Sequence, residues 1–221
     1  QKKRTNKELT VRNEALSKSD SEKEVLLKEL NHRVKNNLQM LASMLNLQEN
    51  NLAGHPAKSA IKSGKLRVEA LSLIHQKLYQ EELTNEIDLS EIIEDLVLNI
   101  FYSHGVVFKP HFKLEKAQIE VNRAIPIALI INEVVTNSLK YAFEQVEDPV
   151  LEVIIERNED NLRLILSDNG KGNKFQLNGK KSGFGLKLVS ALVEQLSATS
   201  DVSLANGTSW SILIPDKEYS S

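Results

Sequence analysis

The first third of the chain carries apolar residues at helical spacing. One stripe of apolar positions at steps of three and four runs from Leu27 to Leu45, which is typical of an amphipathic helix. The segment 50–56, rich in Asn, Gly and Pro, ends this pattern, and a second stripe runs from Ile61 to Leu78. Two such helices joined by a short turn predict a helical hairpin over residues 25–84. Because a lone hairpin cannot bury a wide apolar face, we expect it to dimerise into a four-helix bundle.

Residues 1–24 are mostly polar and predict a helical linker. Leu9 and Leu16 lie seven residues apart, as in a coiled coil, although Lys23 occupies the next heptad position. The chain begins with Gln-Lys-Lys-Arg and has no initial Met. We therefore expect a fragment from which an upstream sensor domain has been removed, with the linker helix leading out of that domain.

From residue 85 onward, helical patterns alternate with short patterns of period two. The predicted helices are Leu89 to Tyr102 with an N-cap in Leu89-Ser90-Glu91, Ala124 to Phe143 with Pro126 in its first turn, and Phe184 to Leu196. The predicted strands are 106–114, 118–121, 150–157, 161–167, 199–204 and 209–214, the last two turning at Asn206-Gly207. Residues 169–182 read as a loop. Helices and mostly antiparallel strands predict a two-layer α/β sandwich over residues 85–221, so the whole chain is of the α+β class.

Composition limits the partners and the compartment. The 221 residues carry a net charge of −2, which provides no general attraction for nucleic acid. The chain has no cysteine, so it forms no disulfide, and we expect a cytoplasmic protein. The most apolar run, Ala124 to Val135, is shorter than the roughly 20 residues that span a bilayer and contains Glu133. We expect no membrane segment in this part of the protein. A membrane tether in an upstream region is compatible with this sequence.

Three polar residues share one face of the predicted helix 124–143. Glu133, Asn137 and Lys140 stand at i, i+4 and i+7. A carboxylate, an amide and an ammonium in line suit hydrated Mg²⁺ with attached phosphates, because Mg²⁺ prefers oxygen ligands and keeps several waters. A solvated helix face fits the same pattern, so the stripe alone does not distinguish a Mg²⁺-phosphate site from an ordinary surface.

Two glycine clusters follow. In Asp168-Asn169-Gly170-Lys171-Gly172, alternate glycines let the backbone approach a ligand, and the carboxylate can accept a hydrogen bond from a base; an ordinary Asp-Asn-Gly turn has the same sequence. Ser182-Gly183-Phe184-Gly185-Leu186 opens a helix, whose free N–H groups favour anions. Neither cluster has the spacing of a Rossmann fingerprint or a P-loop, so a nucleotide would bind in another manner.

The stretch "LNHRVKNNL" puts a titratable side chain on the first helix. His32 lies about 200° around the helix from the apolar stripe and should face solvent. A neutral imidazole is a competent nucleophile toward a γ-phosphoryl group. Arg33 and Lys35 could neutralise charge, and Asn36, one turn on, could orient the ring. An inert surface histidine has the same pattern.

Four segments of the second region resemble one known domain. "NEVVTNSLKYAF", "DNGKG", "GFGL" and "NGTSWSILIP" are similar, in order, to the boxes of the nucleotide-binding domain shared by sensor histidine kinases, gyrase, the Hsp-type chaperones and the mismatch-repair ATPases. The resemblance implies that Glu133 and Asn137 serve catalysis and Mg²⁺, with Asn137 as the metal ligand. It implies that Asp168, with Thr208, reads adenine. The remaining ATP-site residues implied by the resemblance are Lys140, Tyr141, Gly170, Gly172, Gly183, Phe184, Gly185 and Leu186.

The hairpin resembles the phosphoacceptor region of one histidine-kinase subfamily, of the HisKA_2 or HWE type, with the signature H-R-x-x-N. "LLKELNHRVKNNLQMLASMLNLQ" and "RVEALSLIHQKLY" carry this resemblance. It implies that His32 is the phosphoacceptor. Many histidine kinases have an acid directly after that histidine, where this chain has Arg33, so the base that assists His32 is not identified. The subfamily often has two adjacent histidines; here the first is Asn31.

The resemblance as a whole implies a sensor histidine kinase core. It would autophosphorylate on His32 from Mg²⁺-ATP and pass the phosphoryl group to an aspartate of a response regulator, as a homodimer controlled through the upstream helix. Two alternatives on the same ATP-binding fold stay open. One is an anti-sigma-type protein serine kinase, and the other is a dimeric adaptor without turnover.

Overall fold

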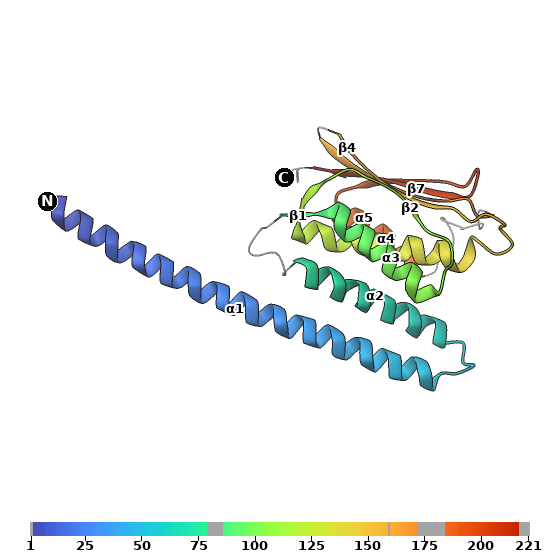
Figure 1. The fold of residues 1–221 in the computed structure, drawn as a ribbon, viewed down its shortest axis with the longest axis horizontal. Helices are drawn as coiled ribbons and strands as arrows, with labels where there is room; N and C mark the ends of the chain where they lie inside the picture. Colours follow the sequence, from blue (N-terminus) through green and yellow to red (C-terminus); the bar gives the residue numbers. More distant parts are fainter. Residues whose placement is uncertain (1, 79–85, 159, 172–183, 217–221) are drawn as a thin grey trace.

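The protein consists of a long helical hairpin and an α/β domain that packs against its second helix (Figure 1). The structure, a computed structural model, describes residues 2–78, 86–158, 160–171 and 184–216. Helix α1 (Lys2–Asn51) continues through the predicted linker without a break and is about 75 Å long. Helix α2 (Lys58–Leu78) returns alongside it after the turn at 52–57. The predicted helical hairpin is confirmed.

The apolar stripe of α1 is covered only in part by α2. Leu38 is buried against the hairpin partner, whereas Leu30 and Leu41 on the same stripe keep 55% and 49% of their surface exposed. Met40, Met44 and Leu47 are also more than half exposed. Since this much contiguous apolar surface is unusual on a protein face that meets only water, the hairpin has a further face available for packing.

The α/β domain is built on a five-stranded sheet. Its strand order is β2-β4-β5-β7-β6, in which β2 runs parallel to β4 and the other neighbours are antiparallel. The strands are β2 (His111–Leu114), β4 (Leu151–Asn158), β5 (Asn161–Asp168), β6 (Thr199–Ser203) and β7 (Thr208–Pro215). Two short strands, β1 (Glu86–Asp88) and β3 (Gln118–Glu120), pair separately.

Three helices cover one face of this sheet: α3 (Leu89–His104), α4 (Val121–Tyr141) and α5 (Phe184–Gln195). The alternating residues of β4, β5 and β7 that face them are apolar and buried, and they form the core together with the inward faces of the helices. Helix α2 packs on the outer side of α4, so α1, α2, the helical layer and the sheet follow one another in Figure 1. The predicted α+β class and two-layer sandwich are confirmed.

Some predicted boundaries are wrong. The N-cap of α3 is Asp88, whose carboxylate accepts a hydrogen bond from the backbone N–H of Ser90. Strand β2 begins at His111 rather than at 106, because Pro110 has no N–H to donate to a neighbouring strand. Helix α4 begins three residues earlier than predicted, so Pro126 lies in its second turn. Strand β1 was not predicted, and most of the predicted loop 169–182 lies outside the described residues.

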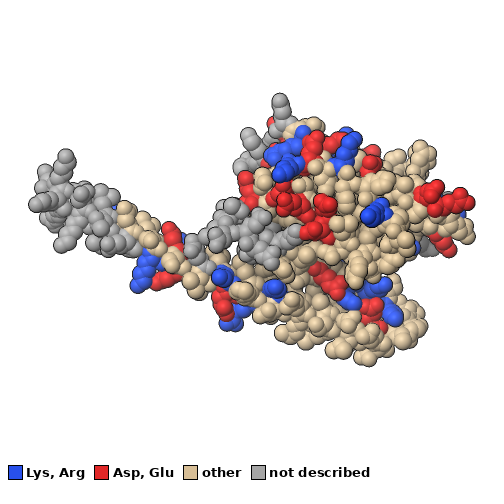
Figure 2. Space-filling model, in the orientation of Figure 1, with Lys and Arg blue, Asp and Glu red and all other residues tan. Residues whose placement is uncertain are grey.

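Charged side chains of both signs occur on the visible surface. In the face shown in Figure 2, acidic and basic side chains are interspersed over the α/β domain. Within the described ranges, no helix combines the length and the apolar character needed to cross a bilayer. Function must therefore be sought in local groups of residues rather than in a general surface field.

Candidate nucleotide and phosphotransfer site

Strand periodicity places Asp168 and Thr208 next to each other inside the domain. Along β5, the buried positions Leu162, Leu164 and Leu166 lead by steps of two to Asp168. Along β7, Thr208 opens the buried series that continues with Trp210. Since Asp168 and Thr208 are register partners, both side chains enter the helical side of the sheet at the same end.

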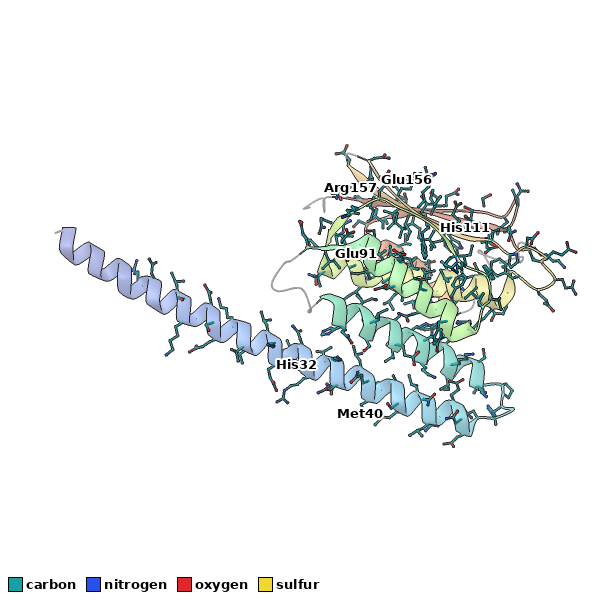
Figure 3. All side chains as sticks on the ribbon, viewed as in Figure 1. His32, Met40, Glu91, His111, Glu156 and Arg157 are labelled. Atoms are coloured by element: carbon teal, nitrogen blue, oxygen red, sulfur yellow. The ribbon has the colours of Figure 1, made fainter. Side chains whose placement is uncertain are left out.

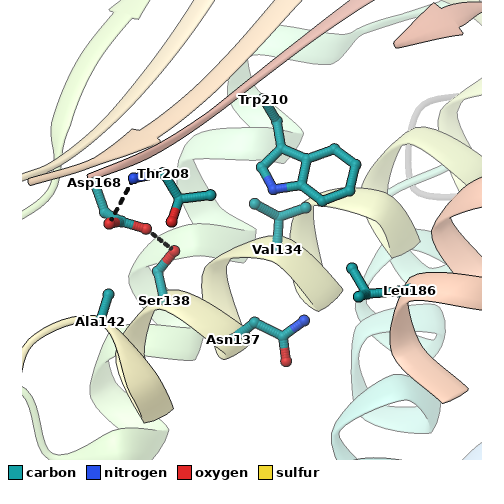
Figure 4. A pocket seen from close by; sticks show the side chains of 8 residues that line it. All are labelled: Val134, Asn137, Ser138, Ala142, Asp168, Leu186, Thr208 and Trp210. Carbon is teal, nitrogen blue, oxygen red and sulfur yellow. Dashed lines mark hydrogen bonds between the residues drawn. The ribbon is translucent and has the colours of Figure 1, made fainter. Parts of the chain in front are cut away.

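Asp168 is held by three donors. The Ser138 hydroxyl on α4 donates to Oδ2 at 2.6 Å, and the backbone N–H of Thr208 donates to Oδ1 at 3.2 Å (Figure 4). The backbone N–H of Gly170 donates to Oδ1 at 3.0 Å. A buried carboxylate with this many donors is fixed in orientation, and its remaining lone pairs are available to a ligand. An amine that approached it would meet a preorganised acceptor.

A small cavity lies beside this carboxylate. Its lining is Val134, Asn137, Ser138, Ala142, Asp168, Leu186, Thr208 and Trp210 (Figure 4). The cavity volume is about 10 Å³, which is room for about one water molecule, so seating a planar base requires side chains such as Leu186 or Trp210 to move. An apolar slot with a single carboxylate at its end is suited to a flat, mostly apolar ring that carries an amine.

The hairpin turn before β7 passes close to the backbone of Asp168. Gly207 has a φ of +102°, and a Cβ at this position would lie 1.9 Å from the Asp168 carbonyl oxygen. Only glycine accepts both the dihedral angle and the close approach. The turn predicted at Asn206-Gly207 is confirmed, and it brings the Thr208 N–H onto Asp168.

A second stripe of α4 faces helix α2 rather than solvent. The Glu133 carboxylate is buried and paired with Arg67 of α2, and the Lys140 ammonium donates to the Ser63 hydroxyl of α2 at 2.9 Å. Burial lowers the pKa of Lys140, and the positive charge of Lys62 lowers it further. Asn137 lies between Glu133 and Lys140 on this stripe and also lines the cavity. The solvated-face alternative is therefore wrong for Glu133, and of these three residues Asn137 is the one that lines the cavity.

The predicted phosphoacceptor lies apart from this cavity. His32 is exposed on α1, as the helical phase predicts (Figure 3). The Arg33 guanidinium donates to the Glu29 carboxylate of its own helix at 2.8 Å. Among the residues that the structure describes, no hydrogen bond joins Asn36 to His32, so the proposed orientation of the ring by Asn36 stays a prediction. The structure brings Asn137, Asp168, Leu186 and Thr208 together, but not His32.

The remaining predicted residues vary in position. Phe184 is 68% exposed and lies under the Arg67 guanidinium, and Tyr141 is exposed at the end of α4. Gly185 approaches Glu133 closely, since a Cβ there would lie 2.5 Å from its Oε2. Gly172 and Gly183 lie outside the described residues.

Five residues of the site were not predicted from the sequence as site residues. Ser138 anchors Asp168, Arg67 pairs with Glu133, and Val134, Ala142 and Trp210 line the cavity. The two-residue spacing from Thr208 could have placed Trp210 on the inward face, and the step of four from Val134 could have placed Ser138 beside it. No local pattern predicts the partner of Arg67, which lies 66 residues away.

Fold and site together define an ATPase-type domain, with a carboxylate-ended slot, joined to a helical hairpin that carries an exposed histidine. Comparison with family models agrees. Residues 29–104 match the model described as histidine kinase, of the HisKA_2 type, and residues 122–218 match the model of the histidine kinase-, DNA gyrase B- and HSP90-like ATPases. The two matches cover more than half of the chain, so the chain belongs to the histidine kinase family and contains its ATP-binding domain.

Individual relatives have the same character. The sensor histidine kinase PdtaS of Mycolicibacterium smegmatis is 27% identical over 175 residues, which is 77% of this chain and 35% of that protein. The blue-light-activated histidine kinase 2 of Erythrobacter litoralis is 28% identical over 201 residues, covering 86% of this chain and 56% of that protein. The solved histidine kinase domain of the Erythrobacter litoralis EL346 blue-light activated histidine kinase superposes with a TM-score of 0.66, at 28% identity, over 86% of this chain and 90% of that domain. The chain thus spans between about a third and about half of the curated relatives it matches.

Proposed function

We propose that this chain is the catalytic core of a sensor histidine kinase that phosphorylates His32 from ATP and then passes the phosphoryl group to an aspartate of a response regulator. The observation that carries the proposal is the combination of an exposed His32 on α1 with the Asp168 slot in one chain. An imidazole on the surface, with no packing role, is free to meet a phosphorus atom presented by a second domain.

The adenine of ATP would enter the slot with its exocyclic amine donating to Asp168. Thr208 and the Asp168 carboxylate define the polar end of the slot, and Val134, Leu186 and Trp210 supply apolar contact for the ring. The triphosphate would then extend past Asn137, which lines the cavity, toward Lys140 one turn further along α4, whose ammonium would offset its negative charge.

The residues at the mouth fit Mg²⁺. In the described part of the chain, no three His, Cys, Asp or Glu side chains converge into a metal cage. A single amide oxygen, from Asn137, together with phosphate oxygens and water is the kind of donor set that Mg²⁺ accepts. When bound, the ion would neutralise the negative charge of the phosphates. Glu133 is the carboxylate that we propose takes part in the phosphoryl transfer.

The chemistry is a nucleophilic displacement at phosphorus. The unprotonated ring nitrogen of His32 attacks the γ-phosphorus, the bond to the β,γ-bridging oxygen breaks, and ADP leaves. The other ring nitrogen releases its proton to water, which leaves an uncharged ring that carries the negatively charged phosphoryl group. In the second step an aspartate oxygen of the regulator attacks the same phosphorus, and the imidazole leaves.

The exposed apolar surface of α1 supports a homodimer. A second copy packed on the strip of Leu30, Met40, Leu41, Met44 and Leu47 would bury it in a four-helix bundle. In that arrangement α1 would also transmit a change in an upstream sensor to the level of His32, because the helix is continuous from Lys2 to Asn51.

Labelling with ATP that carries ³²P in its γ-phosphate tests the proposal. We expect label that is lost in acid and kept in base on the unmodified chain, and none on His32→Gln. The variant should keep its thermal stability, because His32 is exposed. Label on a serine of an added protein would instead indicate a serine kinase, and nucleotide binding without any label would indicate a silent adaptor.

A further inference from the structure

Arg67 makes the most elaborate contact between the hairpin and the ATP-binding domain. Its Nε donates to Glu133 Oε1 at 2.5 Å, and its Nη2 donates to Oε2 at 2.9 Å, so both carboxylate oxygens are occupied. The guanidinium carbon also lies 4.9 Å from the centre of the Phe184 ring. The side chains of Arg67 and Glu133 are only 21% and 7% exposed. One residue of α2 therefore binds both α4 and the first residue of α5.

A second polar contact repeats the first one turn away. Ser63, four residues before Arg67 on the same face of α2, accepts a hydrogen bond from Lys140, seven residues after Glu133 on α4. The two contacts run in opposite directions along the two helices, so they fix both the position and the direction of α2 on α4. The groups they occupy, Glu133 and Lys140, lie one turn on either side of Asn137, which lines the proposed ATP slot.

The docked position is at the wrong height for phosphorylation of His32. Lys65 of α2 donates to Asn46 of α1 at 2.8 Å, which places these two residues at one level of the hairpin. His32 lies 14 residues before Asn46 on α1, and Arg67 lies two residues after Lys65 on α2. Because the two helices are antiparallel, both steps lead the same way along the hairpin. At 1.5 Å per residue, the level of His32 is therefore roughly 20 Å from the level of Arg67. Phosphoryl transfer requires the reacting atoms to be about 3 to 3.5 Å apart. A second subunit related by an axis parallel to the helices would present its histidine at the same height.

We propose that Arg67 is the latch of an autoinhibited state, in which its ion pair with Glu133 holds the ATP-binding domain on α2 away from His32. This inference rests on the proposed kinase function. Release of Arg67 frees both oxygens of Glu133, frees Lys140 from Ser63 and lets the domain travel along the hairpin. The triphosphate that is proposed to extend toward Lys140 would compete with Ser63 for the Lys140 ammonium, so nucleotide binding and the docked state oppose each other.

The latch lies within a cluster of like charges. The charges of Lys62, Arg67 and Glu133 all act on the Lys140 ammonium, so three cations and one carboxylate meet where α2 lies on α4. A desolvated pair gains little net stability after the cost of removing both ions from water, so a modest signal can open it.

The test uses Arg67→Gln, with Arg163→Gln as the matched control. Arg163 lies on β5, half exposed, and its ion pair with Glu156 at 3.9 Å is far from the site. Arg67→Gln should raise the initial rate of His32 labelling and tighten ATP binding, each by about threefold to tenfold, because the closed state is depopulated. Arg67→Lys, which keeps the charge but not the two-pronged contact, should fall between Arg67→Gln and the unmodified chain. Arg163→Gln should change neither quantity.

A distance measurement separates the latch from the chemistry. The chain has no cysteine, so nitroxide labels can be attached specifically at Gln39→Cys on α1 and Glu94→Cys on α3, both exposed. With labelled chain diluted into an excess of unlabelled chain, so that a dimer carries labels on one subunit, and without nucleotide, we expect one distance for the Arg67 protein and an additional, different population for Arg67→Gln. An unchanged distance in Arg67→Gln would overturn the latch. A lower labelling rate in this variant would also overturn it, because Arg67 would then be a catalytic group. If no variant and no unmodified chain incorporated label, the proposed kinase function would be refuted. The distance measurement would still test whether Arg67 holds the ATP-binding domain on α2.

Discussion

Replacing Asp168 by Asn tests the adenine slot with a change of one atom. In the structure, Oδ1 accepts from the N–H groups of Gly170 and Thr208, and Oδ2 accepts from Ser138. An asparagine can keep its oxygen at the Oδ1 position and turn its amide N–H toward Ser138, whose hydroxyl can rotate and accept. The fold should therefore survive, with a loss of about 1 to 2 kcal/mol in the free energy of unfolding.

Nucleotide binding should suffer much more. The adenine amine would lose a charged acceptor and would meet a donor in its place, which we estimate at about 3 kcal/mol, or roughly a hundredfold in the Kd for ATP. Trp210 lines the slot and is the only tryptophan of the chain, so its fluorescence reports ATP binding directly. A thermal melt of the same sample measures the fold.

Asp201→Asn is the matched control, because Asp201 lies exposed on β6. It should change both the Kd and the unfolding free energy by less than about 0.5 kcal/mol. If Asp168→Asn binds ATP as tightly as the unmodified chain, adenine is held elsewhere. If it unfolds, Asp168 is mainly a structural residue, and the reasoning fails in a different way.

Three further predictions concern the frame around the site. Gly207→Ala should lower the free energy of unfolding in urea by about 2 to 4 kcal/mol, because its Cβ meets the Asp168 carbonyl. Gly54→Ala is the control: Gly54 has a φ of +78° but lies in open space, so the change should cost only about 1 to 2 kcal/mol. Equal losses for the two variants would contradict the packing argument. Burial lowers the pKa of His104 below its usual 6.5, so the unfolded chain binds more protons than the folded chain near this pH. Stability should therefore fall as the pH drops from about 6.5 through the lowered pKa. His104→Gln should flatten this part of a curve of Tm against pH, and an unchanged slope would refute the prediction. Leu41→Lys should shift light scattering from dimer to monomer without lowering the helical content, and a variant that stays dimeric would exclude this strip as the interface.

Much of the fold follows from local pattern, because each element carries its own signal. The step of three and four through Leu38 predicts α1, and Asn206-Gly207 between two alternating runs predicts the β6–β7 turn. The phase of His32 on its helix, and hence its exposure, also follows from the sequence, since a helical repeat is a local property. The step of two that ends at Asp168 places this carboxylate on the buried face of its strand.

The partners of these residues were decided only by the tertiary structure. That Ser138 anchors Asp168 depends on how α4 crosses the sheet, and that Arg67 pairs with Glu133 depends on how the hairpin docks on the domain. Such contacts join segments tens of residues apart, and the free energy that selects them comes from burying whole faces of helices and strands rather than from any short motif. The sequence by itself determined which side chains are available on each surface; the packing of those surfaces decided which of them meet.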